Sequence, residues 1–172
     1  GSDNNRNVSL TTTGLNTTVT DSSVNLGSGT FTVSTGTLTT VPGTAAADIT
    51  AGSFVVSAST SIGATGAASR VDVDATTSNL TSAGGIFMDA VGGGGNAVTA
   101  ASTLGNIEFD SATETLTLSN VVATNGRIDV TTTGQAIIAT IVTSSTSNND
   151  NDITLTTTTS GNVTVGSVTT TV

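Results

Sequence analysis

The sequence of 172 residues contains no cysteine, lysine, histidine, tyrosine or tryptophan. Without cysteine it can form no disulfide, and it has no thiol nucleophile and no imidazole or lysine base. Without tyrosine and tryptophan it lacks the large rings on which sugars stack. These absences argue against catalysis, so we expect a protein that is not an enzyme, with no catalytic residue and no cofactor.

Positive charge is also scarce. Three arginines stand against twelve aspartates and glutamates, which gives a formal net charge of −9. An acidic surface repels phosphates, so neither nucleic acid nor an anionic membrane surface is an expected partner. No apolar run approaches the roughly 20 residues that span a bilayer, and we therefore expect no membrane insertion.

Small polar residues are abundant, with 40 threonines, 21 serines, 20 glycines and 14 asparagines. Good helix formers of the surface type are few, since the chain has no lysine, only two glutamates and one glutamine. Threonine and valine suit a pleated sheet because their β-branched side chains have restricted rotamers. The 41 Leu, Ile, Val and Phe residues recur regularly, which favours an ordered all-β protein over a disordered chain.

Apolar doublets, two apolar residues separated by one position, recur along the whole chain. The eight doublets are Val8/Leu10, Phe31/Val33, Phe54/Val56, Val71/Val73, Ile86/Met88, Ile107/Phe109, Ile128/Val130 and Ile153/Leu155. Their spacing is uneven: the two intervals that flank Val71 are the shortest, and the interval before Ile153 is the longest. A mean repeat of about 21 residues is typical of a solenoid, in which each turn buries its apolar side chains against its neighbours.

Each interval contains a further apolar position near its middle, such as Val41. Most intervals contain another, less regular one later, such as Leu104. Three short strands per turn predict an all-β fold, a right-handed parallel β-helix of about seven to eight rungs. Tandem immunoglobulin-like β-sandwiches are the alternative, because their turn signals recur at a similar spacing. We expect residues 3–172 to form one domain, an internal segment of a larger protein, with Gly1 and Ser2 as a cloning remnant.

Several repeats open with glycine, one polar residue and an apolar doublet, as in GNIEF, GRIDV, GTFTV, GSFVV and GNVTV. In this repeat grammar most of the chain resembles the filamentous-haemagglutinin-type exoproteins and related large bacterial surface adhesins. The resemblance implies a long secreted β-helical stalk displayed at the bacterial cell surface. It includes no catalytic signature, and the family's amino-terminal secretion domain is not recognisable here.

The residue inside each doublet is expected to point outward, so stacked rungs predict a single ladder on one face. The ladder reads Ser9, Thr32, Val55, Asp72, Phe87, Glu108, Asp129 and Thr154. Only two of these eight residues are threonine, so this face does not suit the flat threonine array of an ice-binding protein. The face formed by the second strands is less clearly defined, and ice binding stays an alternative there.

Glu108 and Asp129 occupy neighbouring rungs of this ladder, about 5 Å apart by strand spacing. That separation suits the carboxylate pair of a retaining glycosidase or a bridging cation. The interpretation that we favour is a solvated acidic face, on which Arg127 softens the repulsion between carboxylates.

The segment Asn148–Asp152 lies in the longest interval and is rich in oxygen atoms, which calcium prefers as ligands. It lacks the glycine and the distal glutamate of an EF-hand loop, so a polar loop is favoured. We therefore predict no metal site. The weak candidates for calcium are Asp150, Asp152, Glu108 and Asp129.

These features favour a structural or adhesive segment of a bacterial secreted or cell-surface fibre, which supplies reach and rigidity for adhesion or surface-layer assembly. The alternatives are a carbohydrate-active β-helix, that is, a polysaccharide lyase or glycosidase, and a calcium- or ice-binding module. The expected partners are a host-cell or matrix receptor, or neighbouring copies of the protein itself.

Overall fold

The chain folds as a parallel β-solenoid of about seven turns. The computed structural model describes residues 6–20, 24–41, 46–146 and 151–172. In these ranges it contains the 3-10 helix η1 (Ala67–Ser69) and the strands β1 (Val8–Thr11), β2 (Thr17–Val19), β3 (Val24–Asn25), β4 (Thr30–Thr40), β5 (Ile49–Ile62), β6 (Val71–Ser82), β7 (Ile86–Ala90), β8 (Asn96–Ser102), β9 (Ile107–Ser111), β10 (Leu116–Ala123), β11 (Ile128–Thr133), β12 (Ile137–Ser145), β13 (Ile153–Thr158) and β14 (Val163–Thr171). The predicted parallel β-helix is confirmed, whereas immunoglobulin-like sandwiches would require antiparallel sheets.

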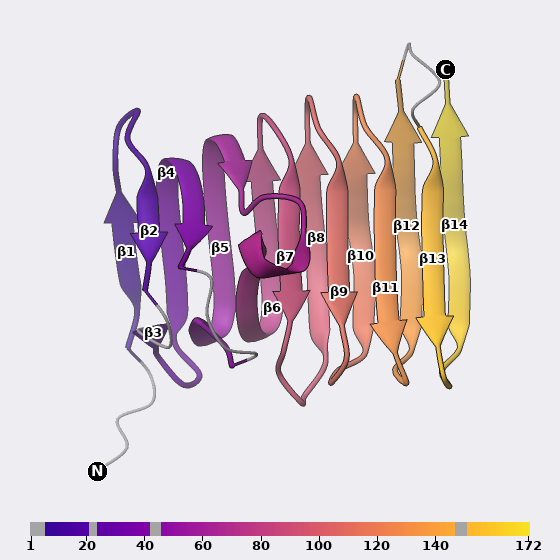
Figure 1. Cartoon of the computed structure of the whole chain (residues 1–172), viewed down its shortest axis with the longest axis horizontal. Helices are drawn as coiled ribbons and strands as arrows, with labels where there is room; N and C mark the ends of the chain where they lie inside the picture. The colour runs from indigo at the N-terminus through magenta and orange to yellow at the C-terminus, as the bar shows by residue number, and fades with distance from the viewer. Residues whose placement is uncertain (1–5, 21–23, 42–45, 147–150) are drawn as a thin grey trace.

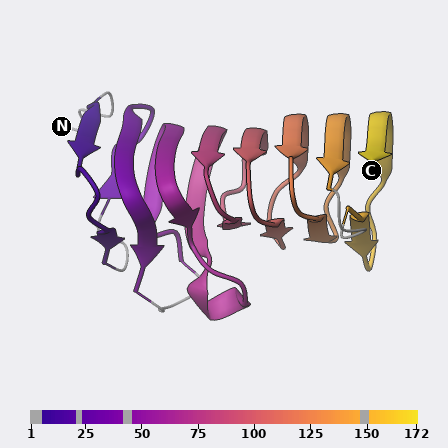
Figure 2. The same ribbon diagram turned by 90° about the horizontal axis from the view of Figure 1, so that it is seen from above.

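The solenoid has two broad faces joined by turns. The front face contains β7, β9, β11 and β13, which run downward in Figure 1. The back face contains β1, the first part of β4, the middle of β5, the second part of β6, and β8, β10, β12 and β14, which run upward in Figure 1. The front strands run downward, the back strands run upward, and the chain advances from left to right in Figure 1. These three directions together make the coil right-handed. The two faces form separate rows when seen from above, and the segment with η1 projects beyond the front row (Figure 2).

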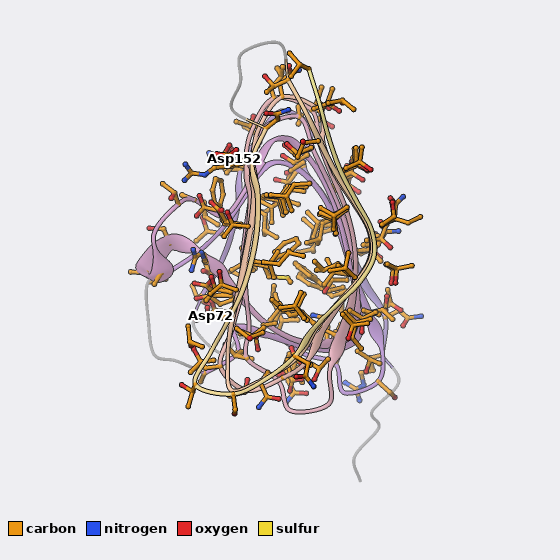
Figure 3. All side chains as sticks on the ribbon, turned by 90° about the vertical axis from the view of Figure 1, so that its right-hand side faces the viewer. Asp72 and Asp152 are labelled. Carbon is orange, nitrogen blue, oxygen red and sulfur yellow. The ribbon has the colours of Figure 1, made fainter. Side chains whose placement is uncertain are left out.

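The core lies between the two faces, where side chains fill the wedge-shaped section seen along the axis (Figure 3). Six of the eight doublets are buried, and those of the first and last rungs, Val8/Leu10 and Ile153/Leu155, are only partly covered. Ile128, for example, is fully buried between its register partners Ile107 and Ile153. Burying each such side chain stabilises the fold by about 1.5–3 kcal/mol, so neighbouring rungs hold one another in place.

The doublets do not form the single column that the sequence predicts. Val55 stands opposite Asn79 on the back face, whereas Asp72 stands opposite Asp89 on the front face. The predicted ladder therefore divides into three. One ladder, on the back face, contains Ser9, Thr32 and Val55, and a second, on the front face, contains Phe87, Glu108, Asp129 and Thr154. Asp72 belongs to a third ladder, also on the front face, in which it pairs with Asp89. The single ladder is wrong because its members lie on two faces.

Two apolar positions expected inside the solenoid lie on its surface. Val41 follows the end of β4 and is 42% exposed, and Leu104 lies in the turn between β8 and β9 and is 70% exposed. Both occupy turns, where the strict inward and outward alternation of a strand no longer applies.

Glycine precedes many doublets because the turn before each doublet stacks tightly on the turn of the preceding rung. A Cβ on Gly126 would lie 2.5 Å from the carbonyl oxygen of Gly105, and a Cβ on Gly105 would lie 2.6 Å from the amide nitrogen of Gly85. Buried serines donate hydrogen bonds to the carbonyl oxygens of these glycine turns. The hydroxyl of Ser102 donates to the Gly105 carbonyl at 2.7 Å, and that of Ser144 donates to the Gly126 carbonyl at 2.6 Å. The recurring glycine is therefore a requirement of rung stacking.

Candidate functional site

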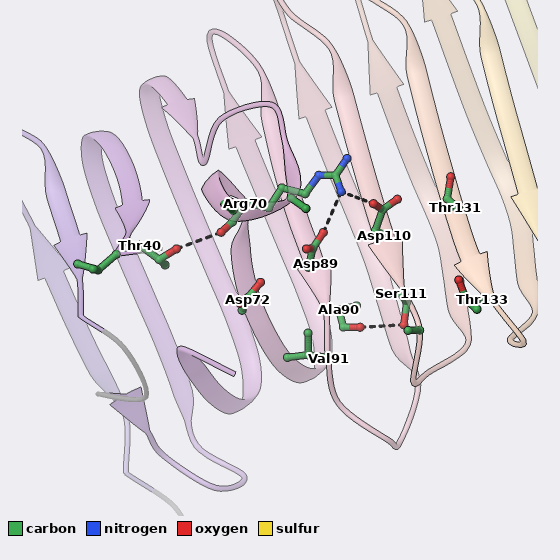
Figure 4. Close-up of a pocket in the computed structure, with 14 residues that line it drawn as sticks. Thr40, Arg70, Asp72, Asp89, Ala90, Val91, Asp110, Ser111, Thr131 and Thr133 are labelled. Atoms are coloured by element: carbon green, nitrogen blue, oxygen red, sulfur yellow. Dashed lines mark hydrogen bonds and ion pairs between the residues drawn. The ribbon is translucent and has the colours of Figure 1, made fainter. Parts of the chain in front are cut away.

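An insertion interrupts the front face between β5 and β6. Ile62 pairs with Ile86, and Val71 pairs with Met88, so residues 63–70 occupy the space that Phe87 alone takes on the next rung. The inserted residues therefore leave the sheet, and Figure 1 shows them as the coil in front of β6 and β7. The insertion places η1 and Arg70 over the outward side of the front face (Figure 4).

Arg70 is the centre of an ion cluster that spans three rungs. Its Nη1 atom contacts Asp89 Oδ1 at 3.3 Å and the carboxylate of Asp110, and its Nη2 atom contacts Glu108 Oε2 at 3.3 Å. The side chain of Arg70 is only 12% exposed. Thr65, from the same insertion, also donates its hydroxyl to Glu108 Oε2 at 3.3 Å. The insertion thus covers the acidic ladder and partly neutralises it.

Parallel register explains why the carboxylates gather here. Asp72, Asp89 and Asp110 are successive partners, and so are Glu108 and Asp129 in the adjacent ladder. Equivalent positions on neighbouring rungs lie about 4.8 Å apart, so acidic residues at these positions repel one another. Arg127 offsets this repulsion at the far end of the cluster, because its Nε lies 2.8 Å from Asp129 Oδ2 and its Nη2 lies 3.7 Å from Glu108 Oε1.

The carboxylate of Asp89 is in the least favourable environment of the cluster. Burial raises its pKa to about 6, the nearby charge of Asp110 acts in the same direction, and Arg70 counteracts both effects only in part. One guanidinium shared among three carboxylates therefore leaves the cluster with uncompensated negative charge.

A groove of about 480 Å³ runs beside this cluster. Asp72, Asp89 and Asp110 line it together with Arg70 and with the ladder residues Thr131 and Thr133 (Figure 4). Valine and alanine side chains, among them Val41, Ala67 and Val91, line it as well, so the groove combines apolar walls with carboxylates and hydroxyls. Asp89 and Asp110 share the guanidinium of Arg70, which holds both carboxylates as ion-pair partners.

Of the three weak metal candidates within the described residues, the structure brings two together. Glu108 and Asp129 are register partners as predicted, and Arg127 contacts both. The predicted solvated face is wrong for Glu108, which is buried because the insertion lies over it, whereas Asp129 is half-buried. Asp152 is exposed immediately before β13, and Asp150 lies outside the described residues. Within the described ranges, no three acidic side chains are arranged to hold a metal ion.

A second acidic site, centred on Glu114, was missed by the sequence reasoning. Glu114 is 2% exposed, its Oε2 accepts a hydrogen bond from the amide of Gly95 at 3.1 Å, and its Oε1 has no hydrogen-bond partner. Burial raises the pKa of this carboxyl to about 7, with Asp74 adding to the effect. A Cβ on Gly92 would overlap Asp74 Oδ1 and lie 3.0 Å from Glu114 Oε2, so the glycine run leaves room for both carboxylates.

Arg70, Asp89 and Asp110 were also absent from the sequence-based candidates. A signal for them did exist, because the two shortest intervals between doublets flank Val71, directly after the insertion that carries Arg70. A short interval between two doublets does not show whether the second doublet lies on the other face or follows a segment outside the sheet. The interval alone therefore does not predict the insertion.

No protein-family model matches this sequence, and no curated protein or solved structure is significantly similar to it. In the described part of the chain, no helix is long and apolar enough to span a membrane.

Proposed function

We propose that this chain is a structural segment of a bacterial secreted or cell-surface fibre, in which it supplies reach and rigidity for adhesion or surface-layer assembly. The observation that carries the proposal is the continuity of the inner columns from rung to rung. Ile62, Ile86, Ile107, Ile128 and Ile153 form one such column without a break. A solenoid of this kind extends by adding rungs, and each added rung lengthens it by about 4.8 Å.

The last described strand supports this interpretation. Val163, Val165 and Val168 of β14 continue the columns of Ile137, Ala139 and Val142, which are buried. The three valines themselves are 39%, 53% and 39% exposed. A further rung stacked on β14 would bury them and would also pair its open edge, which is otherwise a template for strand addition.

The proposed cell-surface setting rests on the resemblance of the repeats to those of large bacterial surface adhesins. The same resemblance is the basis for proposing secretion and adhesion. It is also the basis for proposing a receptor or neighbouring copies of the chain as partners. The carbohydrate-active alternative has less support, because Arg70 engages the carboxylates at the groove. Of the four phenylalanines, Phe31, Phe54 and Phe109 are buried in the core and offer no ring to a sugar.

Association through the ends is the direct test. We expect light scattering to show association of the isolated chain at high salt, because salt screens the repulsion between acidic surfaces. Small-angle X-ray scattering should show that this association increases the length of the particle. Val165→Asp should abolish it by placing a charge in the end column, whereas Thr164→Asp, which points outward on the same strand, should preserve it. A chain that stays monomeric at high concentration in both low and high salt would contradict the proposal.

A further inference from the structure

The back face differs from the front face in its charge. Its outward positions form three ladders that run through the rungs. The first contains Thr30, Ser53, Thr77, Ala97, Thr117, Ile138 and Thr164; the second contains Ser9, Thr32, Val55, Asn79, Thr99 and Asn120; the third contains Thr11, Ser34, Ser57, Thr81, Ala101, Val122, Thr143 and Thr169. No charged residue occurs in any of these three ladders.

The charged side chains of the described residues all lie elsewhere. Arg70, Asp72, Asp89, Glu108, Asp110, Arg127 and Asp129 belong to the front face and its insertion. The others, Arg6, Asp48, Asp74, Glu114 and Asp152, lie in turns or outside the three ladders. The described part of the molecule therefore gathers its charge away from the back face, which presents an uncharged surface.

The uncharged surface has the size of a protein interface. Eight strands spaced about 4.8 Å apart, each about seven residues wide at about 3.3 Å per residue, make a face of roughly 800 Å². A stable protein–protein interface buries about 800 Å² on each partner. Ile138 and Ile141 are 39% and 45% exposed on β12, and the threonine, alanine and valine side chains around them present methyl groups that lose little entropy on burial.

We infer that the back face packs against the back face of a second copy of this chain. Charge selects this partner, because two chains of net charge −9 repel one another through their acidic front faces, whereas the uncharged ladders meet without repulsion. Two sheets packed face to face lie about 10 Å apart with interleaved short side chains, as in a β-sandwich. A two-fold axis places the same surface on both partners, so the interface is self-complementary.

The inference is independent of the proposed fibre function, because it uses the back face and leaves the ends free. End-to-end stacking lengthens the particle, whereas pairing of back faces thickens it at constant length. Scattering profiles therefore distinguish the two modes of association. A particle that thickens without lengthening would contradict the fibre proposal and support back-face pairing. A particle that lengthens without thickening would do the opposite.

The test compares two variants of equal charge by sedimentation equilibrium. Thr117→Glu with Thr143→Glu places two carboxylates in the middle of the back face, and we expect the dimer dissociation constant to rise at least tenfold. Thr154→Glu with Thr156→Glu adds the same charge to the front-face ladders and should leave the dimer intact. Circular dichroism checks that both variants keep the β-sheet spectrum of the parent chain.

Three results would overturn the inference. The first is a parent chain that remains monomeric up to millimolar concentration, and the second is a dimer that both variants affect equally. The third is a monomer that inhibits ice recrystallisation and loses this activity in the Thr117 and Thr143 variant, because the back face would then be a surface for ice. A thickened dimer that only the back-face variant disrupts is the expected result.

Discussion

The guanidinium of Arg70 contacts the carboxylate of Asp110, a residue 40 positions later in the chain. The same group also contacts Asp89 and Glu108, so one side chain from an insertion joins three rungs of the front face. A parallel solenoid stacks equivalent positions, and acidic residues at those positions repel one another unless a cation lies between them. The insertion supplies that cation.

Replacing Arg70 should destabilise the fold much more than replacing Arg127. Arg70→Gln leaves the buried carboxylate of Glu108 and the largely covered carboxylate of Asp89 without their shared partner, and we expect a loss of about 3 kcal/mol in the free energy of unfolding. Arg127 is 43% exposed, so Arg127→Gln should cost less than about 1 kcal/mol. Urea denaturation of both variants measures the difference. Equal losses would show that the cluster does not depend on the insertion.

The assigned register predicts opposite outcomes for two adjacent residues. Ile128 is fully buried, so Ile128→Asp should place an unpaired charge in the core and destabilise the chain by more than about 3 kcal/mol. Asp129 points outward and contacts Arg127, so Asp129→Ser should change stability by less than about 1 kcal/mol. Thermal unfolding followed by circular dichroism measures both. Similar melting temperatures would mean that the inward and outward assignment of β11 is wrong.

Glycine should matter only where rungs stack closely. Gly126→Ala would place a Cβ 2.5 Å from the backbone of the preceding rung, and forcing the turns apart should destabilise the chain by about 1–3 kcal/mol. Gly94 has no atom within 4 Å of its Cβ position, so Gly94→Ala should be neutral or slightly stabilising. Comparing the urea midpoints of the two variants tests whether turn stacking determines the glycine pattern. A larger loss of stability in Gly94→Ala than in Gly126→Ala would contradict this explanation of the glycine pattern.

Burial of Glu114 predicts an unusual pH dependence of stability. Its pKa is raised from 4.5 to about 7 in the folded state, so the folded chain binds this proton more tightly than the unfolded chain does. The contribution is complete below about pH 4.5 and is lost as the pH rises through about 7, with a magnitude of about 3 kcal/mol. Glu114→Gln should remove the part of this dependence that lies between about pH 6 and 7 and leave the part below pH 6 that the raised pKa of Asp89 contributes, whereas Asp152→Asn, at an exposed carboxyl, should retain both parts. Urea titrations at pH 5, 6, 7 and 8 compare the slopes, and identical slopes for Glu114→Gln and the parent chain would exclude this role for Glu114.

Much of the fold was predictable from the sequence because it depends on local repetition. The doublets predicted parallel rungs, and Ile107, Ile128 and Ile153 stack in the predicted order. The pairing of Glu108 with Asp129 followed from the same spacing. These features lie on consecutive rungs of similar length, so counting positions was sufficient.

The remaining features depend on long-range register, which residue counting does not provide. Val71 follows an insertion and lies on a different face from Phe54. The number of residues between them shows neither the change of face nor the segment outside the sheet. For the same reason the burial of Glu108 was not predicted, since Arg70 and Thr65 cover it from a distant, earlier segment of the chain. Side-chain types predicted the rungs, but only the three-dimensional register shows which rungs carry the charge.

The most direct test of this account is disulfide formation in a chain that has no cysteine of its own. Val55 and Asn79 are register partners on the back face, so their Cα atoms should lie at about 5 Å, within the range that a disulfide spans. The double variant Val55→Cys with Asn79→Cys should form an intramolecular disulfide on mild oxidation, detected by mass spectrometry of the peptides. Val55→Cys with Asp72→Cys should not form one, because those residues lie on different faces. A disulfide in the second variant and none in the first would contradict the separation of the charged front face from the uncharged back face.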